Sequence, residues 1–514
     1  MEKEDFVFKI NLKFRKPQLP SIDKKELINI KYSLIEPFAY AHIFWDKENK
    51  ELIYKLEEPE LDTKEREILK VLEDGVRELI NISYIAVKKG ETVVRYLEKN
   101  IKILLDELGI SINSDSYQKI MYYIYRDFVG LNEIEALMRD YYIEDVECNG
   151  VNTPVYVVHR KYRNLRTNII YKNADRLSSF VEKLAQKCGK YISYANPILE
   201  GALEEGSRVS ATYSSDVSSR GASFTIRKFT KEPFTPIQLI DLGSVSPEVL
   251  AYLWLLIEYS GNIMVIGGTG SGKTSFLNSL AFFIPPQARV VSIEDTKEIN
   301  ILHENWLPSV TREQVSTLGS ERYGEVSMFD LLRESFRQRP DYVIVGEIRG
   351  KEAYVLFQGL SSGHPGMGTM HANSVDAMVK RLETEPINLS PALIEALDVV
   401  CIMIQDKVGN KMIRRLQEVV EIVKVDDSNV SSNVPFKWDP ANKTFLYKLE
   451  NYVFEKLFIK YGISKNDLIK EFKSRTELLA KMYQNKIFGF EEVQEVINAY
   501  YKDSAKVLRR FGIV

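Results

Sequence analysis

The sequence predicts an α/β protein whose core is a parallel sheet with helices on both faces, built around a phosphate-binding loop. Residues 267–274 read Gly-Gly-Thr-Gly-Ser-Gly-Lys-Thr and match the loop pattern GxxxxGK[ST] in full. An apolar run precedes the loop, and a helical pattern follows it. Short β-rich runs alternate with helical stretches, which is typical of a parallel sheet. These runs are 263–266, 290–293, 342–346, 367–370 and 399–404.

The loop predicts that the chain binds a nucleoside triphosphate, ATP, together with Mg²⁺. Its glycines let backbone N–H groups turn toward phosphate oxygens, and the start of the following helix adds partial positive charge. Lys273 is expected to reach the β- and γ-phosphates, and the Thr274 hydroxyl to bind Mg²⁺. The residues expected to bind the nucleotide are Gly268, Thr269, Gly270, Ser271, Gly272, Lys273, Thr274 and Ser275.

The composition limits the classes of partner. Lys and Arg number 69 and Asp and Glu number 72 among 514 residues, and this near balance argues against a dedicated nucleic-acid binder. The three cysteines, Cys148, Cys188 and Cys401, lie far apart in the sequence. Neither a disulfide framework nor a Cys-x-x-Cys zinc site is therefore predicted.

The sequence predicts no membrane span. The most apolar run, 249–257, is bounded by Glu248 and Glu258 and is far shorter than the ~20 residues that cross a bilayer. The first residues, Met-Glu-Lys-Glu-Asp, lack the apolar core of a secretory signal. We therefore expect a cytoplasmic protein that meets the membrane only peripherally, through partners or through its surface.

Three regions are expected before the linker. Residues 1–30 are predicted to form a flexible basic arm, either a solvated tail or a contact for acidic headgroups or a partner. Residues 31–130 are predicted to be largely helical, with strands at 40–45 and 51–56. Residues 131–229 are predicted to be a mixed α/β domain. The basic residues of the arm are Lys9, Lys13, Arg15, Lys16, Lys24 and Lys25.

The remaining half is expected to hold a linker, the nucleotide-binding core and a tail. The linker is placed at 230–240, because Lys231-Glu-Pro-Phe-Thr-Pro236 breaks both the helical and the strand periods. Residues 241–430 contain the phosphate loop and the alternating runs. Residues 431–514 are predicted to be helical and charged.

Two acids at predicted strand ends are candidates for chemistry on the triphosphate. Glu294 follows the run 290–293, and the carboxyl ends of parallel strands face the ligand. We expect Glu294 to orient and deprotonate an attacking water; the alternative is that it caps the next turn. Glu347 follows the run 342–346 and is placed to reach Mg²⁺, directly or through water. Many ATPases carry Asp-Glu where this chain has Gly346-Glu347, which favours Glu294 as the base.

Histidines and arginines complete the candidates. Two of the five histidines, His364 and His371, lie within eight residues of each other and could sense the γ-phosphate or order the acids. A guanidinium offered across a subunit interface stabilises charge on a transferring phosphoryl group. The candidate arginines are Arg208, Arg220 and Arg227 before the linker, and Arg333, Arg337, Arg339 and Arg349 around the strand that ends at Glu347.

Four motifs, in this order and spacing, resemble those of the secretion ATPase superfamily, which serves type II and type IV secretion and type IV filament assembly. They are GGTGSGKTS (267–275), SIEDTKEI (292–299), RQRPDYVIVGEIRG (337–350) and GHPGMGTMHAN (363–373). The segments 130–162, 204–229 and 303–306 are similar to the archaeal branch. The regions before residue 110 and after residue 430 resemble the archaellum motor ATPase; the alternative is an adhesive-pilus or type II-like assembly ATPase.

The resemblance implies a RecA-like P-loop ATPase core and a hexameric ring of two-lobed subunits that bind ATP between their two domains. It implies that Glu294 is the base, that Glu347 supports Mg²⁺ and water, and that His371 senses the phosphate. Arg208, Arg220 and Arg227 become candidates for contacts to a phosphate across the interface. The implied partner is a polytopic membrane protein at the cytoplasmic face, on which filament subunits are assembled.

Two other classes stay open. A RecA-like recombinase or helicase would need a basic surface, often with aromatic stacking loops, which the charge balance disfavours. A regulator that binds nucleotide without hydrolysis would lack acids at the strand ends, where this chain has Glu294 and Glu347.

Overall fold

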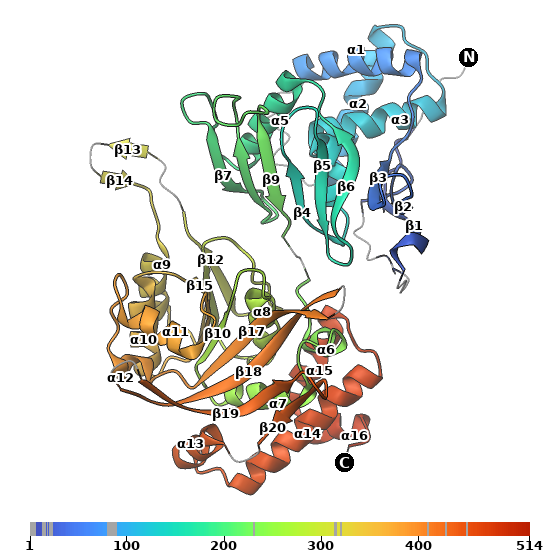
Figure 1. Ribbon diagram of the computed structural model, residues 1–514. Helices are drawn as coiled ribbons and strands as arrows, with labels where there is room; N and C mark the ends of the chain where they lie inside the picture. The colour runs from blue at the N-terminus through green and yellow to red at the C-terminus, as the bar shows by residue number, and fades with distance from the viewer. Residues whose placement is uncertain are drawn as a thin grey trace. The chain divides into compact units, whose positions relative to one another are not determined.

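The computed structural model describes residues 7–12, 17, 19, 24–79, 90–229, 232–312, 316–318, 321–408, 411–426, 429–448 and 451–513. The chain divides into two compact units, Met1–Phe229 and Thr230–Val514 (Figure 1). Each unit is built on one nine-stranded sheet. The C-terminal unit carries the phosphate loop and is described first.

The sheet of the C-terminal unit is parallel in its larger part. Its parallel strands are β10 (Ile263–Gly267), β11 (Val290–Glu294), β12 (Trp306–Val310), β15 (Tyr342–Ile348), β16 (Gly366–Met370) and β17 (Val399–Val408). An antiparallel extension adds β18 (Lys411–Asp426), β19 (Asn429–Asp439) and β20 (Thr444–Tyr447). The order is β12-β11-β15-β16-β10-β17-β18-β19-β20. The predicted α/β class is confirmed, and all five predicted runs fall within strands.

Alternate residues of the parallel strands face two separate cores. On β10, Ile263 and Val265 face one core, and Met264 and Ile266 face the other. Because both faces are covered, β10 is apolar and buried along its whole length. The helices of this unit are α6 (Pro236–Asp241), α7 (Pro247–Glu258), α8 (Lys273–Ala281), α9 (Met328–Ser335), α10 (Glu352–Ser361), α11 (Val375–Glu383), α12 (Pro391–Ile394), α13 (Tyr452–Tyr461), α14 (Lys465–Gln484), α15 (Phe490–Lys502) and α16 (Ser504–Arg510), with a 3₁₀ turn η5 (Phe336–Gln338) and a hairpin of β13 (Ser316–Leu318) and β14 (Glu321–Tyr323).

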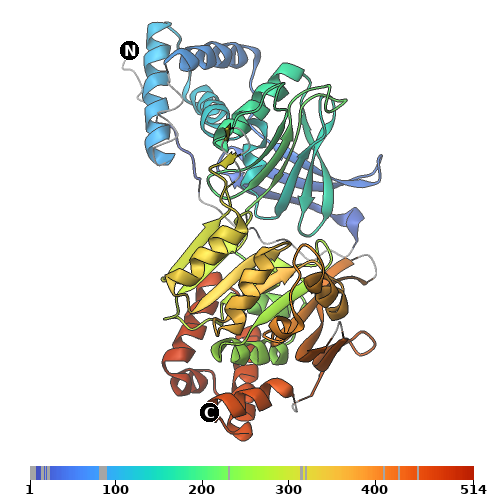
Figure 2. The ribbon, with the colours of Figure 1, turned by 90° about the vertical axis from the view of Figure 1, so that its left-hand side faces the viewer.

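The C-terminal helices belong to the core of this unit. Residues of α7, α8 and α13–α16 share one hydrophobic core, whereas α9–α12 cover the other face of the sheet (Figures 1 and 2). Arg475 of α14 is 2% exposed, bonds to Glu258 and Glu471, and lies 4.7 Å from the ring centre of Trp254 on α7. The predicted tail boundary at residue 431 falls inside β19, so it does not mark a structural division.

The predicted linker is shorter in the structure. Helix α6 begins at Pro236, inside the predicted range 230–240. The Thr235 hydroxyl accepts a hydrogen bond from the backbone N–H of Gln238, and the Gln238 side chain accepts one from the N–H of Thr235. This capping box explains why the prolines of the segment start a helix instead of extending the linker.

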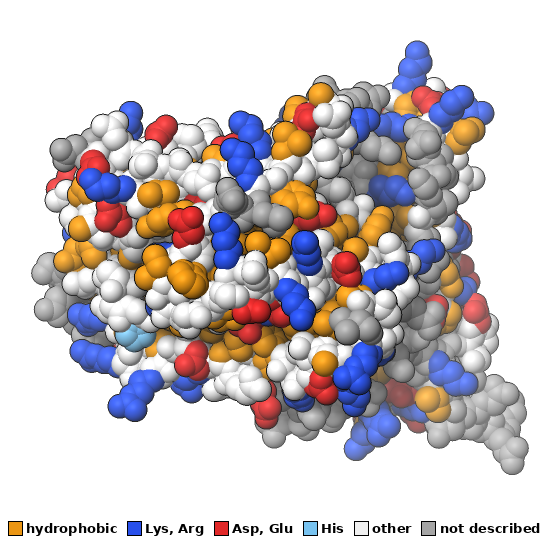
Figure 3. Space-filling model, turned by 90° about the horizontal axis from the view of Figure 1, so that it is seen from below, with side chains coloured by type: hydrophobic (Ala, Val, Ile, Leu, Met, Phe, Trp, Pro, Cys, Tyr) orange, Lys and Arg blue, Asp and Glu red, His pale blue; other side chains and the backbone are white. Residues whose placement is uncertain are grey.

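Among the described residues, no helix is long and apolar enough to cross a membrane. The most apolar one, α7, has residues Val249–Ile257 buried inside the unit, which explains why it is apolar on every side. On the face drawn in Figure 3, hydrophobic side chains are interspersed with charged side chains of both signs.

The sheet of the N-terminal unit is mostly antiparallel. Its strands are β1 (Asn29–Ile35), β2 (Ala39–Asp46), β3 (Glu51–Glu57), β4 (Ile143–Cys148), β5 (Pro154–His159), β6 (Arg163–Ile170), β7 (Ile198–Ala202), β8 (Arg208–Thr212) and β9 (Ser223–Arg227), in the order β1-β2-β3-β6-β5-β4-β9-β8-β7. β3 pairs with β6, so one sheet crosses the division predicted between residues 130 and 131. That division is therefore wrong: the two predicted regions form one unit.

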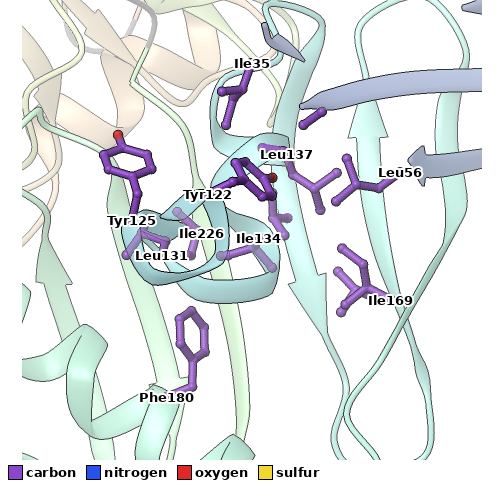
Figure 4. Packing of buried hydrophobic residues seen from close by; sticks show 14 of the residues in the cluster. Ile35, Leu56, Tyr122, Tyr125, Leu131, Ile134, Leu137, Ile169, Phe180 and Ile226 are labelled. Atoms are coloured by element: carbon purple, nitrogen blue, oxygen red, sulfur yellow. The ribbon is translucent and has the colours of Figure 1, made fainter. Parts of the chain in front are cut away.

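Helices cover this sheet over a single core. They are α1 (Thr63–Leu79), α2 (Gly90–Glu107), α3 (Ser114–Ile124), α4 (Glu135–Met138) and α5 (Ala174–Lys187), with short turns η1 (Lys25–Leu27), η3 (Tyr125–Val129) and η4 (Asn132–Ile134). Figure 4 shows Tyr122 and Leu137 from the helical segments near Leu56 and Ile169 of the strands. The helices and strands of the N-terminal unit therefore stabilise one another.

The described part of the basic arm packs against this unit. Phe8 is 6% exposed, stacks on Phe38 with ring centres 5.7 Å apart, and donates its N–H to Glu98. Asn11 forms a β-bridge with Glu36. The prediction of a flexible arm is wrong for these residues, because the alternation of Phe8, Ile10 and Leu12 between polar neighbours provides a strand-like apolar face. Lys13, Arg15 and Lys16 lie outside the described residues.

We expect Phe8→Ala to lower the free energy of unfolding by about 3 kcal/mol, because it leaves a cavity beside Phe38. Val7→Ala is the matched control: Val7 is 55% exposed, so the change should stay within about 0.5 kcal/mol. Urea unfolding followed by circular dichroism measures both. Equal unfolding midpoints for the two variants would mean that the arm is not packed in solution.

Candidate nucleotide-binding site

The phosphate loop joins β10 to α8. Gly270 and Gly272 have φ of 71° and 92°, a region in which a residue with a Cβ is strained, so the glycines are required by the shape of the loop. Lys273 is the first residue of α8 and is 7% exposed. Its Nζ donates to the carbonyl oxygen of Gly268 at 3.0 Å and lies 3.3 Å from Nδ1 of His371. The loop therefore holds its lysine beside the neighbouring strand.

The carboxyl edge of the parallel sheet brings the predicted acids and one histidine together. Glu294 ends β11, Glu347 is near the end of β15, and His371 follows β16. Nε2 of His371 lies 3.1 Å from Oε1 of Glu347, and Nη2 of Arg349 donates to Oε2 of Glu347 at 2.7 Å. Lys273, His371, Glu347 and Arg349 thus form a continuous polar chain.

The position of Lys273 determines which ring nitrogen of His371 carries the proton. An ammonium only donates hydrogen bonds, so Nδ1 of His371 must accept from Lys273, and the ring proton is on Nε2, which faces Glu347. Burial lowers the pKa of His371, and the charge of Lys273 lowers it further. The imidazole is therefore neutral at pH 7.

Glu347 is a stabilised anion. Burial raises the pKa of its carboxyl group, but Arg349, His371 and Lys273 together lower it more, so the net shift is downward. A charged carboxylate at the end of a strand suits a divalent cation. Thr274 and Glu347 would be the protein ligands of Mg²⁺, and the phosphates and water would supply the other oxygens.

Glu294 is in a different environment, although it lies next to β15. It is 2% exposed, and its Oε1 accepts from the N–H groups of Glu298 and Ile299 at 2.8 and 2.9 Å. Burial raises its pKa to about 7, against the effect of these two hydrogen bonds. Oε1 therefore caps the following turn, as the alternative interpretation held, while Oε2 has no hydrogen-bond partner among the described residues.

Gly346 makes room for Glu294. A Cβ on Gly346 would lie 2.9 Å from Cγ of Glu294, which is closer than real Cβ contacts allow. An aspartate at this position, as in many ATPases, would therefore collide with Glu294. Glycine at position 346, where many ATPases have aspartate, is therefore explained by the buried Glu294 on the adjacent strand β11.

The second histidine and three arginines lie at the other end of the sheet. His364 precedes β16, and its ring packs against Phe336 at 5.1 Å, so it is separated from His371 by the length of the strand. Arg333, Arg337 and Arg339 precede β15, opposite to Glu347. Of the two candidate histidines, only His371 therefore lies near Glu347, because the strand between them rises about 3.3 Å per residue.

Two of the three arginines of the N-terminal unit are neighbours. Arg208 and Arg227 are cross-strand partners on β8 and β9, both exposed, and Nε of Arg227 donates to Asp145 at 3.1 Å. Arg220 lies in the β8–β9 connection, at the opposite end of the hairpin, where its carbonyl oxygen accepts from the N–H of Val151. The three arginines therefore do not form one cluster.

Sequence reasoning missed further polar residues of the edge. Arg381 of α11 donates a hydrogen bond to the carbonyl oxygen of His371 at 3.0 Å. The Thr369 hydroxyl donates one to the carbonyl oxygen of Gly346 at 2.6 Å. Arg349 also lies 3.7 Å from Asp295. Thr369 belongs to a quoted motif, but nothing local in the sequence marks Arg381, because its role depends on how α11 packs.

One family model and several relatives match this chain. A family model described as "Type II/IV secretion system protein" matches residues 155–435. The uncharacterized protein MJ0900 of Methanocaldococcus jannaschii is 35% identical over 507 residues, which cover 93% of this chain and 91% of that protein. The type IV secretion system protein PtlH of Bordetella pertussis is 28% identical over 279 residues, 48% of this chain and 80% of that protein.

Solved structures of the same class show a weaker likeness. The VirB11 ATPase of the Brucella suis type IV secretion system is 23% identical and has a TM-score of 0.29, over 55% of this chain and 89% of its own. The pilus retraction motor PilT with bound ADP is 17% identical and has a TM-score of 0.40, and the match covers 72% of this chain and 95% of the PilT chain.

The raised pKa of Glu294 has a consequence for stability. The native state keeps a proton on Glu294 up to about pH 7, whereas the unfolded chain releases it near 4.5. The native state therefore binds more protons between these values, and its free energy of unfolding falls as the pH rises. At roughly 1.4 kcal/mol per pKa unit, we expect the wild type to lose about 2 to 3 kcal/mol more than Glu294→Gln between pH 5 and pH 8.

Urea unfolding at the two pH values measures this difference. Glu304→Gln is the matched control, since Glu304 is exposed and lies in the connection between β11 and β12; it should keep the pH dependence of the wild type. Parallel pH profiles of the wild type and Glu294→Gln would contradict a raised pKa.

Proposed function

The chain belongs to the type II/IV secretion system protein family, and on that premise we propose that it is an ATPase, which hydrolyses ATP to ADP and phosphate with Mg²⁺. The observation that carries the proposal is the polar chain Lys273–His371–Glu347–Arg349 beside the phosphate loop. It joins the cation that would bind the triphosphate to the acid that would hold the metal ion.

In this proposal the two glutamates have separate roles. Glu294, with a pKa of about 7 and a free Oε2, accepts the proton of the attacking water, because a base works best when its pKa is near the operating pH. Glu347 remains charged and, with Thr274, holds Mg²⁺. Bound Mg²⁺ would neutralise charge that develops on the phosphates.

His371 links the phosphate to Glu347. Lys273 has three donors, so it can bind phosphate oxygens while it still donates to His371. A change in the position of Lys273 on hydrolysis therefore changes the partner of the imidazole that faces Glu347. This is how His371 would sense the γ-phosphate.

Arg208 and Arg227 are proposed to bind a phosphate held by another copy of the chain. The two side chains are exposed and stand on paired strands, and Asp145 accepts from Nε of Arg227, so an arriving phosphate would meet two guanidinium groups that lie side by side. The proposed assembly is a homohexamer. Arg220, at the far end of the hairpin, is the weaker candidate.

The proposed machine is an archaeal type IV pilus-like filament, most like the archaellum, whose assembly and possible rotation the ATPase powers. An adhesive-pilus or type II-like secretion system is the alternative. The motifs quoted above and the relative in Methanocaldococcus jannaschii support the archaeal branch. The partner would be a polytopic membrane protein at the cytoplasmic face, with additional contact to acidic lipid through Lys9, Lys24 and Lys25, which are exposed.

A nucleic-acid motor is the more distant alternative. It would need a strongly basic surface, whereas this chain has 69 Lys and Arg against 72 Asp and Glu. We therefore assign no nucleic-acid partner.

Lys273→Ala should abolish hydrolysis and strongly weaken ATP binding, because the loop loses its charge partner for the phosphates.

Glu294→Gln should bind ATP but hydrolyse it at least about 100-fold more slowly, which is the lower end of the effect of losing a general base. Glu347→Gln should also lower the apparent affinity for Mg²⁺. Phosphate release over a Mg²⁺ series measures turnover, and calorimetric titration with a non-hydrolysable ATP analogue measures binding, with exposed Arg337→Ala as the control for both. Normal turnover by Lys273→Ala would refute the ATPase proposal.

Light scattering with a non-hydrolysable ATP analogue should show a hexamer, and a monomer or small oligomer without nucleotide. Arg208→Ala with Arg227→Ala should weaken assembly and turnover more than Arg220→Ala does. A greater loss with Arg220→Ala would move the phosphate contact to Arg220, and a monomer at saturating analogue would contradict the ring.

A further inference from the structure

We propose that Arg414 is a second cation of the nucleotide site, one that binds nucleotide phosphate from within the same subunit; the inference rests on the proposed function. Arg414 lies on β18, far from the loop in sequence. A Cβ on Gly272 would meet Cδ of Arg414 at 3.4 Å and its Cβ at 3.5 Å. The aliphatic part of Arg414 therefore lies beside the loop, at the residue before Lys273, with room for no more than an ordinary side-chain contact between them.

The adjacent residue shows which side chain faces the loop. Nε of Arg415 donates to the carbonyl oxygen of Gly243 at 3.0 Å, and its guanidinium lies 3.8 Å from the ring centre of Trp438. Arg415 is 7% exposed, and its side chain packs against Trp438. Successive side chains of a strand point to opposite faces of the sheet, so the Arg414 side chain lies on the opposite face from Arg415, where it faces the loop.

The backbone of Arg414 is held on two sides. Arg414 is the register partner of Gln405 on β17, and the Ser244 hydroxyl donates to the carbonyl oxygen of Arg414 at 2.7 Å. The N–H of Leu416 donates to the carbonyl oxygen of Ser244 at 2.9 Å. The side chain of Arg414 therefore leaves from a fixed point beside the loop.

The sheet order places the two cations on opposite sides of the loop. β10, which enters the loop, lies between β16 and β17. Lys273 contacts His371 on the β16 side, while Arg414 contacts Gly272 on the β17–β18 side. An anion on the loop would therefore be flanked by the ammonium of Lys273 on one side and by the Arg414 side chain on the other. The guanidinium is always charged and can bind two phosphate oxygens at once, which an ammonium cannot do with the same geometry.

Calorimetric titration with ADP and with pyrophosphate tests this role. Arg414→Gln should raise the dissociation constants of both ligands by about 10- to 100-fold, the range for a lost hydrogen bond to a charged group. Arg414→Lys, which keeps the charge but not the fork, should fall between Arg414→Gln and the wild type. Arg337→Ala removes an exposed arginine at the other end of the sheet and should bind both ligands as the wild type does.

Each outcome is decisive. Unchanged binding of both ligands by Arg414→Gln, with an unchanged melting temperature in the absence of ligand, would overturn the inference. Weaker ADP with unchanged pyrophosphate would also overturn it, because Arg414 would then contact the base or ribose. If the wild type bound neither ligand, the nucleotide site itself would be refuted, which a change confined to Arg414 variants would not do.

Discussion

The arrangement of the site depends on one buried cation. Lys273 is 7% exposed, so its charge has lost most of its water, and an isolated ammonium in such a place is costly. Burial lowers its pKa, and the carboxylate of Glu347 opposes that shift. The carbonyl oxygen of Gly268 and Nδ1 of His371 supply direct acceptors. The strands that carry His371 and Glu347 therefore have to end beside the loop, and the sheet order β15-β16-β10 meets this condition.

The two acids of the edge illustrate how adjacent strands separate the pKa values of like groups. Glu347 meets Arg349, His371 and Lys273, which lower its pKa, whereas Glu294 is enclosed beneath Gly346, and burial raises its pKa to about 7. A pair of carboxyl groups with shifted pKa values in opposite directions can provide an anion and a proton acceptor at the same pH. The small size of Gly346 is what allows both acids to occupy neighbouring strands.

Local sequence information accounts for the strands, the loop and the acids, because each depends on a short pattern: an apolar run, a glycine-rich turn, an acid at a strand end. It does not account for long-range placement. His364 and His371 are close in sequence yet lie at opposite ends of β16, and the helices after residue 451 belong to the core of the C-terminal unit. Phe8 was missed because its apolar neighbours alternate with lysine and asparagine, so the composition of the arm concealed a strand-like face.

The long strand β18 connects the loop to the C-terminal helices. Near its start it presents Arg414 to Gly272, and further along, Glu421 is fully buried and accepts from the hydroxyl of Tyr252 at 2.7 Å and from the N–H of Tyr452 at 2.9 Å. Tyr452 is the first residue of α13, so one strand joins the phosphate loop to the helices that complete the core. β18 pairs with β17 from Lys411 to Glu421 and with β19 from Glu418 to Asp426, so its backbone is held along its whole length. The phosphate loop and helix α13 therefore contact the same strand at two different points.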